Sequence, residues 1–145
     1  MNEEEIKQII EIILNLIRYK KVTWRLEGSA NLLIQGVNVS VRDLDITTDN
    51  NGLKLFRELL NKFVIKDFFN NKINGNSLVC NINGFEVEIN CYGDRELNMF
   101  DKTKIITWKG LEVPIVPLEY ARLFYERINS GDKVEIIKRH LGKLK

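Results

Sequence analysis

The N-terminal stretch repeats apolar side chains at the spacing of one helix face. These positions are Ile6, Ile9, Ile10, Ile13, Leu14 and Ile17. Asn2 precedes the run, and the three glutamates after it would lie at the positive end of a helix dipole. The pattern therefore predicts a first helix that begins at Asn2 and closes at the basic residues Arg18, Lys20 and Lys21.

Beyond this helix, runs of alternating apolar and polar residues are separated by turn signals. Strands are expected over residues 22–26, 43–48, 64–69, 77–82, 85–90, 104–108 and 111–116, with an extended segment over 37–41. Further helices are expected over residues 30–35, 53–63, 117–128 and 133–141. Asn83-Gly84 indicates a tight hairpin turn, and a second hairpin is expected around Lys109-Gly110. This order predicts an α+β fold, in which a mixed β-sheet has flanking helices.

Composition narrows the class of protein. The 145 residues, 44% of them hydrophobic, suit a single domain over residues 1–145. A net charge of +2 is too small to imply nucleic-acid binding. No apolar run is long enough for a membrane span, and no signal peptide is evident. Cys80 and Cys91 match no metal or redox spacing, so we expect free thiols and a cytoplasmic location.

The first segment with chemical character is Gly28-Ser29, between an expected strand and an expected helix. Glycine lets backbone approach a ligand closely, the following helix offers unpaired N–H groups, and Ser29 adds a hydroxyl. Such a turn suits the β- or γ-phosphate of a nucleotide. The alternative is a turn that uses the pair only for geometry and capping.

The second segment is Asp43-Leu44-Asp45 on an expected strand. Alternation places Asp43 and Asp45 on one face, where two carboxylates repel each other unless a cation lies between them. Mg²⁺ prefers such oxygen ligands and commonly combines one or two carboxylates with substrate phosphates. The alternatives are solvated acids at a strand edge or an ion pair of Asp43 with Arg42 or with another basic residue.

The third segment is Glu86-Val87-Glu88, on the strand after the Asn83-Gly84 turn. Glu86 and Glu88 share one face and would add an acid to a two-aspartate site, where it would bind an ion or accept a proton. The alternative is the ordinary outward-facing polar side of a half-exposed strand.

The order of these segments resembles the DNA polymerase beta-like nucleotidyltransferase superfamily. The resemblance is carried by Trp24 to Leu33, by Asp43 to Asp49 and by Val87-Glu88-Ile89, with further similarity around residues 35–37 and 113–119. It is strongest to the small prokaryotic members, including relatives of the lincosamide and aminoglycoside nucleotidyltransferases.

The resemblance implies a role for each residue. Gly28 and Ser29 would cradle the triphosphate, and Asp43 and Asp45 would bind Mg²⁺, as one or two ions. Glu88 would be the third catalytic and metal-binding acid, with Glu86 as the alternative. The implied reaction is in-line attack of an acceptor on the α-phosphorus of a nucleoside triphosphate such as ATP, with pyrophosphate leaving.

Lys133 opens the last expected helix, from which its side chain would reach nucleotide phosphates; an ordinary surface lysine is the alternative. The acceptor is not identified by the sequence. No separate acceptor-binding domain is apparent at this length, so a homodimer or a partner protein would complete that surface. A second hypothesis is an antitoxin-type or partner-binding protein with little or no turnover. Such members usually have a Gly-Ser-Arg-Ala-Arg-Gly turn, whereas Gly28-Ser29-Ala30-Asn31 lacks both arginines.

Overall fold

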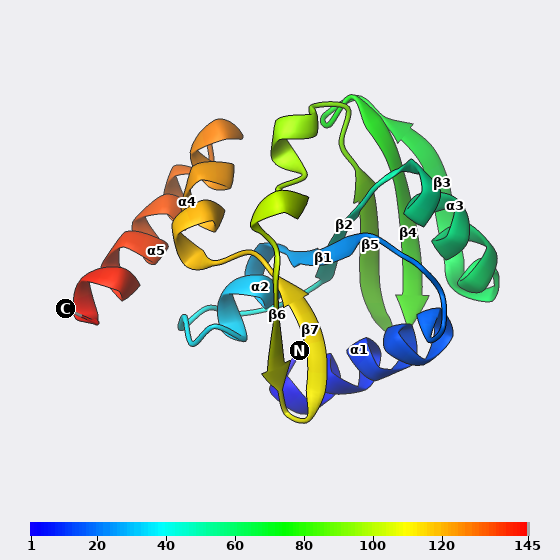
Figure 1. Cartoon of the computed structure of the whole chain (residues 1–145), viewed down its shortest axis with the longest axis horizontal. Coiled ribbons are helices and arrows are strands. Elements are labelled where there is room, and N and C mark those ends of the chain that lie inside the picture. Colours follow the sequence, from blue (N-terminus) through cyan, green and yellow to red (C-terminus); the bar gives the residue numbers. More distant parts are fainter. Residues whose placement is uncertain (145) are drawn as a thin grey trace.

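A five-stranded sheet in the order β1-β2-β5-β4-β3 organises the computed structural model, which describes residues 1–144 (Figure 1). Its strands are β1 (Trp24–Glu27), β2 (Leu44–Thr48), β3 (Val64–Asn70), β4 (Gly75–Ile82) and β5 (Phe85–Cys91). The strands β6 (Lys104–Trp108) and β7 (Leu111–Ile115) form a separate hairpin. β2 and β5 are parallel and the other neighbours are antiparallel. The sheet is therefore mixed, and the expected α+β class is confirmed.

The helices lie around this sheet. They are α1 (Glu3–Ile17), α2 (Gly28–Leu33), α3 (Asn50–Leu59), α4 (Leu118–Arg127) and α5 (Gly131–Lys143). In Figure 1, α4 and α5 lie at one end of the molecule and α3 lies at the other. No helix among residues 1–144 is both long and apolar enough to cross a membrane.

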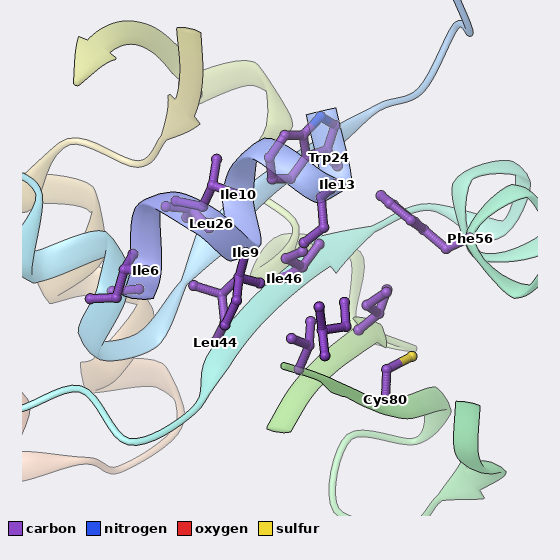
Figure 2. Close-up of a cluster of buried hydrophobic side chains, with 14 of the residues drawn as sticks. Ile6, Ile9, Ile10, Ile13, Trp24, Leu26, Leu44, Ile46, Phe56 and Cys80 are labelled. Atoms are coloured by element: carbon purple, nitrogen blue, oxygen red, sulfur yellow. The ribbon is translucent and has the colours of Figure 1, made fainter. Parts of the chain in front are cut away.

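α1 covers the apolar face of the sheet. It begins with a capping box in which the Asn2 side chain accepts from the backbone of Glu5 and the Glu5 side chain accepts from the backbone of Asn2. Figure 2 shows Ile9 and Ile13 of this helix pointing toward Leu44 and Ile46 of β2. All of these side chains are buried. Removal of this apolar area from water fixes the helix on the sheet.

The two faces of the sheet differ because successive side chains alternate along each strand. The apolar face carries Leu26, Leu44, Ile46, Val87 and Ile89, all fully buried. The opposite face carries the residues between them, which include the acids of β1, β2 and β5. A second cluster of buried side chains from α2, α4 and α5 packs apart from the first core.

Several element boundaries differ from the sequence-based expectations; β1, for example, begins at Trp24 and β4 at Gly75. α2 begins at Gly28, two residues before the expected start. α3 begins at Asn50, because the Asp49 carboxylate caps it by accepting from the Gly52 N–H, and a short 3₁₀ turn over Asn61–Phe63 follows its end. The segment over residues 37–41, expected to be extended, is not a strand of either sheet.

Candidate active site

The turn at Gly28 lies directly against the carboxylate of Asp45. β1 ends at Glu27, and Gly28 opens α2 with a φ of +69°. A Cβ atom at this position would lie 2.5 Å from Oδ2 of Asp45. Both the backbone conformation and the close approach therefore favour glycine here.

Three carboxylates form a row across neighbouring strands. Glu27 of β1 is the cross-strand partner of Asp45 in β2, and Asp45 is the partner of Glu88 in β5. Directly opposite residues share a face of the sheet and stand close together. Asp43 immediately precedes β2, and Glu86 lies on β5 two residues before Glu88. The structure thus brings together the acids of two segments that are far apart in the sequence.

Burial and neighbouring carboxylates raise the pKa values of Asp45 and Glu88. Burial, followed by the charges of Glu27, Glu88, Asp43 and Glu86, raises the pKa of Asp45 to about 8. The pKa of Glu88 is also raised, first by burial and then by Glu86, Glu27 and Asp43. Repulsion among these carboxylates contributes to both raised pKa values, and a cation bound here would relieve that repulsion.

The carboxylate oxygens of the row are of the type that binds Mg²⁺, but they do not form a complete ligand shell. Among residues 1–144, no group of three or more His, Cys, Asp or Glu side chains is placed to hold a metal ion. The carboxylate oxygens are nevertheless the ligands that Mg²⁺ prefers, and this ion usually takes its remaining ligands from water and substrate phosphates. Asp43, Asp45 and Glu88 therefore suit a metal that arrives with a nucleotide.

Lys133 reaches the Gly28-Ser29 turn from the other end of the chain. It lies in the first turn of α5, and its Nζ donates to Oγ of Ser29 at 2.9 Å. The contact places a cation beside the serine that follows Gly28. Lys133 is therefore part of the same cluster, whatever its role in binding.

Glu27 is the site residue that sequence reasoning missed. It is 8% exposed, and its Oε1 accepts hydrogen bonds from Oγ1 of Thr47 at 2.6 Å and from the Tyr92 hydroxyl at 2.7 Å. The one feature of the sequence that could have indicated a role for Glu27 is its position immediately before Gly28. That position gives no hint of burial or of the hydrogen bonds.

Arg25 anchors the loop after β5 to this part of the sheet. Its guanidinium is 2% exposed and donates to the backbone carbonyls of Leu26, Leu97 and Asn98. It also lies over the ring of Phe124 from α4, 5.2 Å from the centroid. Burial lowers the pKa of Arg25, and the Glu27 carboxylate opposes that shift. These contacts connect β1, the loop and α4.

Two neighbouring side chains have no direct place in the cluster. Arg42 is exposed and forms no ion pair with residues 1–144, so the alternative in which it pairs with Asp43 is wrong. Tyr125 is 5% exposed and packs in the second core, as expected for a core residue.

The model of one protein family extends over nearly all of these elements. The aminoglycoside-2''-adenylyltransferase family matches residues 9–141, from α1 to α5. The chain belongs to this family. The resemblance to small nucleotidyltransferases of this kind is thereby confirmed. No curated protein sequence matches the chain.

Solved structures of nucleotidyltransferases share the fold. TM1012 of Thermotoga maritima, which carries a provisional nucleotidyltransferase assignment, superposes with a TM-score of 0.77 at 25% identity, covering 99% of this chain and 96% of that one. The lincosamide antibiotic adenylyltransferase LnuA, with lincomycin bound, superposes with a TM-score of 0.60 at 16% identity. The match covers 95% of this chain and 97% of that one. ANT(2'')-Ia in complex with adenylyl-2''-tobramycin superposes with a TM-score of 0.61 at 10% identity. The match covers 94% of this chain and 89% of that one.

Proposed function

We propose that this protein transfers the nucleoside monophosphate of a nucleoside triphosphate to an acceptor hydroxyl in a Mg²⁺-dependent reaction. The acceptor oxygen would form a bond to the α-phosphorus while the bond between that phosphorus and the bridging oxygen of pyrophosphate breaks. The observation that carries the proposal is the alignment of Asp45 with Glu88 beside the Gly28-Ser29 turn. Membership of an adenylyltransferase family supports it and makes ATP the first donor to test.

In this proposal the basic and hydroxyl side chains bind the triphosphate, and the acidic side chains bind Mg²⁺. Lys133 and the Ser29 hydroxyl, 2.9 Å apart, would bind the triphosphate, and Gly28 would let the phosphates approach the backbone. Asp43 and Asp45 would hold Mg²⁺, with Glu88 as a third ligand. Glu88 would also accept the proton of the attacking hydroxyl, leaving Glu86 as the alternative on the same strand face. When bound, Mg²⁺ neutralises phosphate charge and lowers the pKa of the acceptor.

The length of the chain is compatible with an acceptor site of its own. LnuA, a lincosamide antibiotic adenylyltransferase, is matched over 97% of its length, so a relative of similar size binds an antibiotic. An acceptor-binding surface supplied by a separate domain is therefore not required for this proposal. We propose a hydroxyl-bearing small molecule as the first class of acceptor to test.

Label transfer tests the proposed function. The protein would be incubated with Mg²⁺, a panel of aminoglycosides and lincosamides, and ATP labelled in either the α- or the γ-phosphate. Label from the α-position alone should appear on an acceptor, with release of pyrophosphate. Transfer of the γ-label would contradict the proposal, since the protein would then be a phosphotransferase. Asp43→Asn/Asp45→Asn should abolish transfer.

A further inference from the structure

Glu27 is an acid of the cluster to which the proposed reaction gives no part. Its carboxylate is held in one orientation, because the Thr47 and Tyr92 hydroxyls both donate to Oε1. The Arg25 guanidinium lies 3.8 Å from the same oxygen. Arg25 is itself held by three backbone carbonyls, so it is not free to follow the Glu27 side chain.

The second oxygen of Glu27 is left available. Oε2 accepts no hydrogen bond from residues 1–144, yet it is not among their buried side-chain atoms that lack a partner. It therefore keeps contact with solvent. One oxygen of the carboxylate is therefore anchored to the fold, and the other is not.

This fixed charge faces Asp45 across the strand pair. Glu27 and Asp45 are directly opposite each other in β1 and β2, an arrangement in which like charges destabilise a sheet. A fold that merely needed a polar side chain at this position would accommodate glutamine, whose carbonyl oxygen accepts the same two hydrogen bonds. The Glu27 charge lies 3.8 Å from the buried Arg25 guanidinium and opposite Asp45, so it acts on both groups.

We infer that Glu27 is a positioning residue of the transferase site, whose anchored negative charge against Asp45 increases the affinity of the acidic row for a divalent cation. The inference rests on the proposed function. A divalent cation bound at Asp45 would be attracted by the Glu27 charge directly opposite in β1, so that charge favours the bound state. Glu27 acts through Asp45, and Thr47 and Tyr92 keep it there.

Mn²⁺ binding to Glu27→Gln tests this inference. The variant retains an acceptor for Thr47 and Tyr92 but loses the charge. The dissociation constant for Mn²⁺, followed by its paramagnetic resonance signal with ATP present, should rise roughly tenfold, as for other residues that support metal ligands. The thermal midpoint without ion should fall, because the buried Arg25 guanidinium loses the carboxylate beside it. Tyr92→Phe, which keeps the charge and loses one anchor, should weaken binding less.

Glu112→Gln is the matched control. Its Oε1 accepts from Oγ1 of Thr107 at 2.7 Å in the β6–β7 hairpin, and the change should leave Mn²⁺ affinity unaltered. An unchanged Mn²⁺ affinity in Glu27→Gln, with or without a lower midpoint, would overturn the inference and leave the proposed function standing. Weaker Mn²⁺ binding without any nucleotidyl transfer by the wild type would overturn only the proposed function. If the wild type binds no Mn²⁺, both fail.

Discussion

Gly28 determines how closely the turn after β1 can approach Asp45. At a φ of +69° any other residue is strained, and an added Cβ would lie 2.5 Å from the Asp45 Oδ2 atom. The clash falls on the end of a side chain, so the Asp45 carboxylate would move while the backbone remains. At the scale of single residues, this glycine thus connects backbone geometry to the position of a proposed metal ligand.

Gly28→Ala should therefore reduce both stability and ligand binding. The strained backbone should cost about 1–3 kcal/mol of unfolding free energy, measured by denaturant titration. Mg-ATP affinity should fall as Asp45 is displaced. Gly142→Ala is the control, since nothing lies within 4 Å of its added Cβ in α5. That change should be neutral or stabilise by up to about 1 kcal/mol. Equal effects of the two substitutions would contradict the account.

Lys133 makes a separate residue-scale prediction. Lys133→Gln removes the cation beside Ser29 and should weaken ATP binding by about 1.5 kcal/mol, roughly tenfold, as expected for one hydrogen bond to a charged group. The thermal midpoint without ligand should change little. Lys138→Gln, on the same helix and 4.0 Å from Glu135, is the control. Calorimetric titration that finds equal affinity in both variants would remove Lys133 from the site.

At the scale of elements, Arg25 ties the segment after β5 to β1. Its donation to the carbonyls of Leu97 and Asn98 holds the 3₁₀ turn Arg95–Leu97 next to the strand that leads into Gly28. A lysine cannot reproduce this planar set of donors. Arg25 is the buried anchor of this loop, and ion pairs of Arg127 with Asp94 and Glu96 hold its exposed side.

Arg25→Lys should therefore destabilise the protein by about 2–3 kcal/mol, since buried carbonyls lose their partners. Hydrogen exchange should quicken at the amides of residues 95–98 before it quickens in α1. Arg18→Lys, at an exposed arginine that bonds only Asn15, should have no comparable effect. Uniform exchange across the chain would show instead that the loop unfolds only with the whole molecule.

Elements with strong local signals were the ones that the sequence could predict. The capping box and apolar spacing defined α1, and positive φ angles at Asn83 and Gly84 confirm the first hairpin turn. The expected start of α3 at residue 53 is late, because Asp49-Asn50-Asn51-Gly52 has the composition of a turn whereas Asp49 caps the helix. Local patterns do not distinguish a turn from a cap when the same residue types serve both.

At the scale of the whole molecule, the candidate site is an assembly of distant segments. The parallel pairing that sets Asp45 against Glu88, and the contact between Lys133 and Ser29 across 104 positions, depend on tertiary packing. Sequence similarity identified Asp45 and Glu88 as candidate site residues. The periodicity of the strands could not predict that the two lie opposite each other in β2 and β5. Glu27 was missed for this reason, because its role follows only from which strand residues lie opposite it.

The central claim is that this assembly binds a magnesium–nucleotide complex. The most direct test is the thermal midpoint of the wild type and of Asp43→Asn/Asp45→Asn, with each of four nucleoside triphosphates in the presence and absence of Mg²⁺. Ligand at 100 times its dissociation constant should stabilise the wild type by about 2.7 kcal/mol, and the double variant should show no shift. A wild type that no Mg²⁺–nucleotide stabilises, or a double variant stabilised equally, would contradict the account.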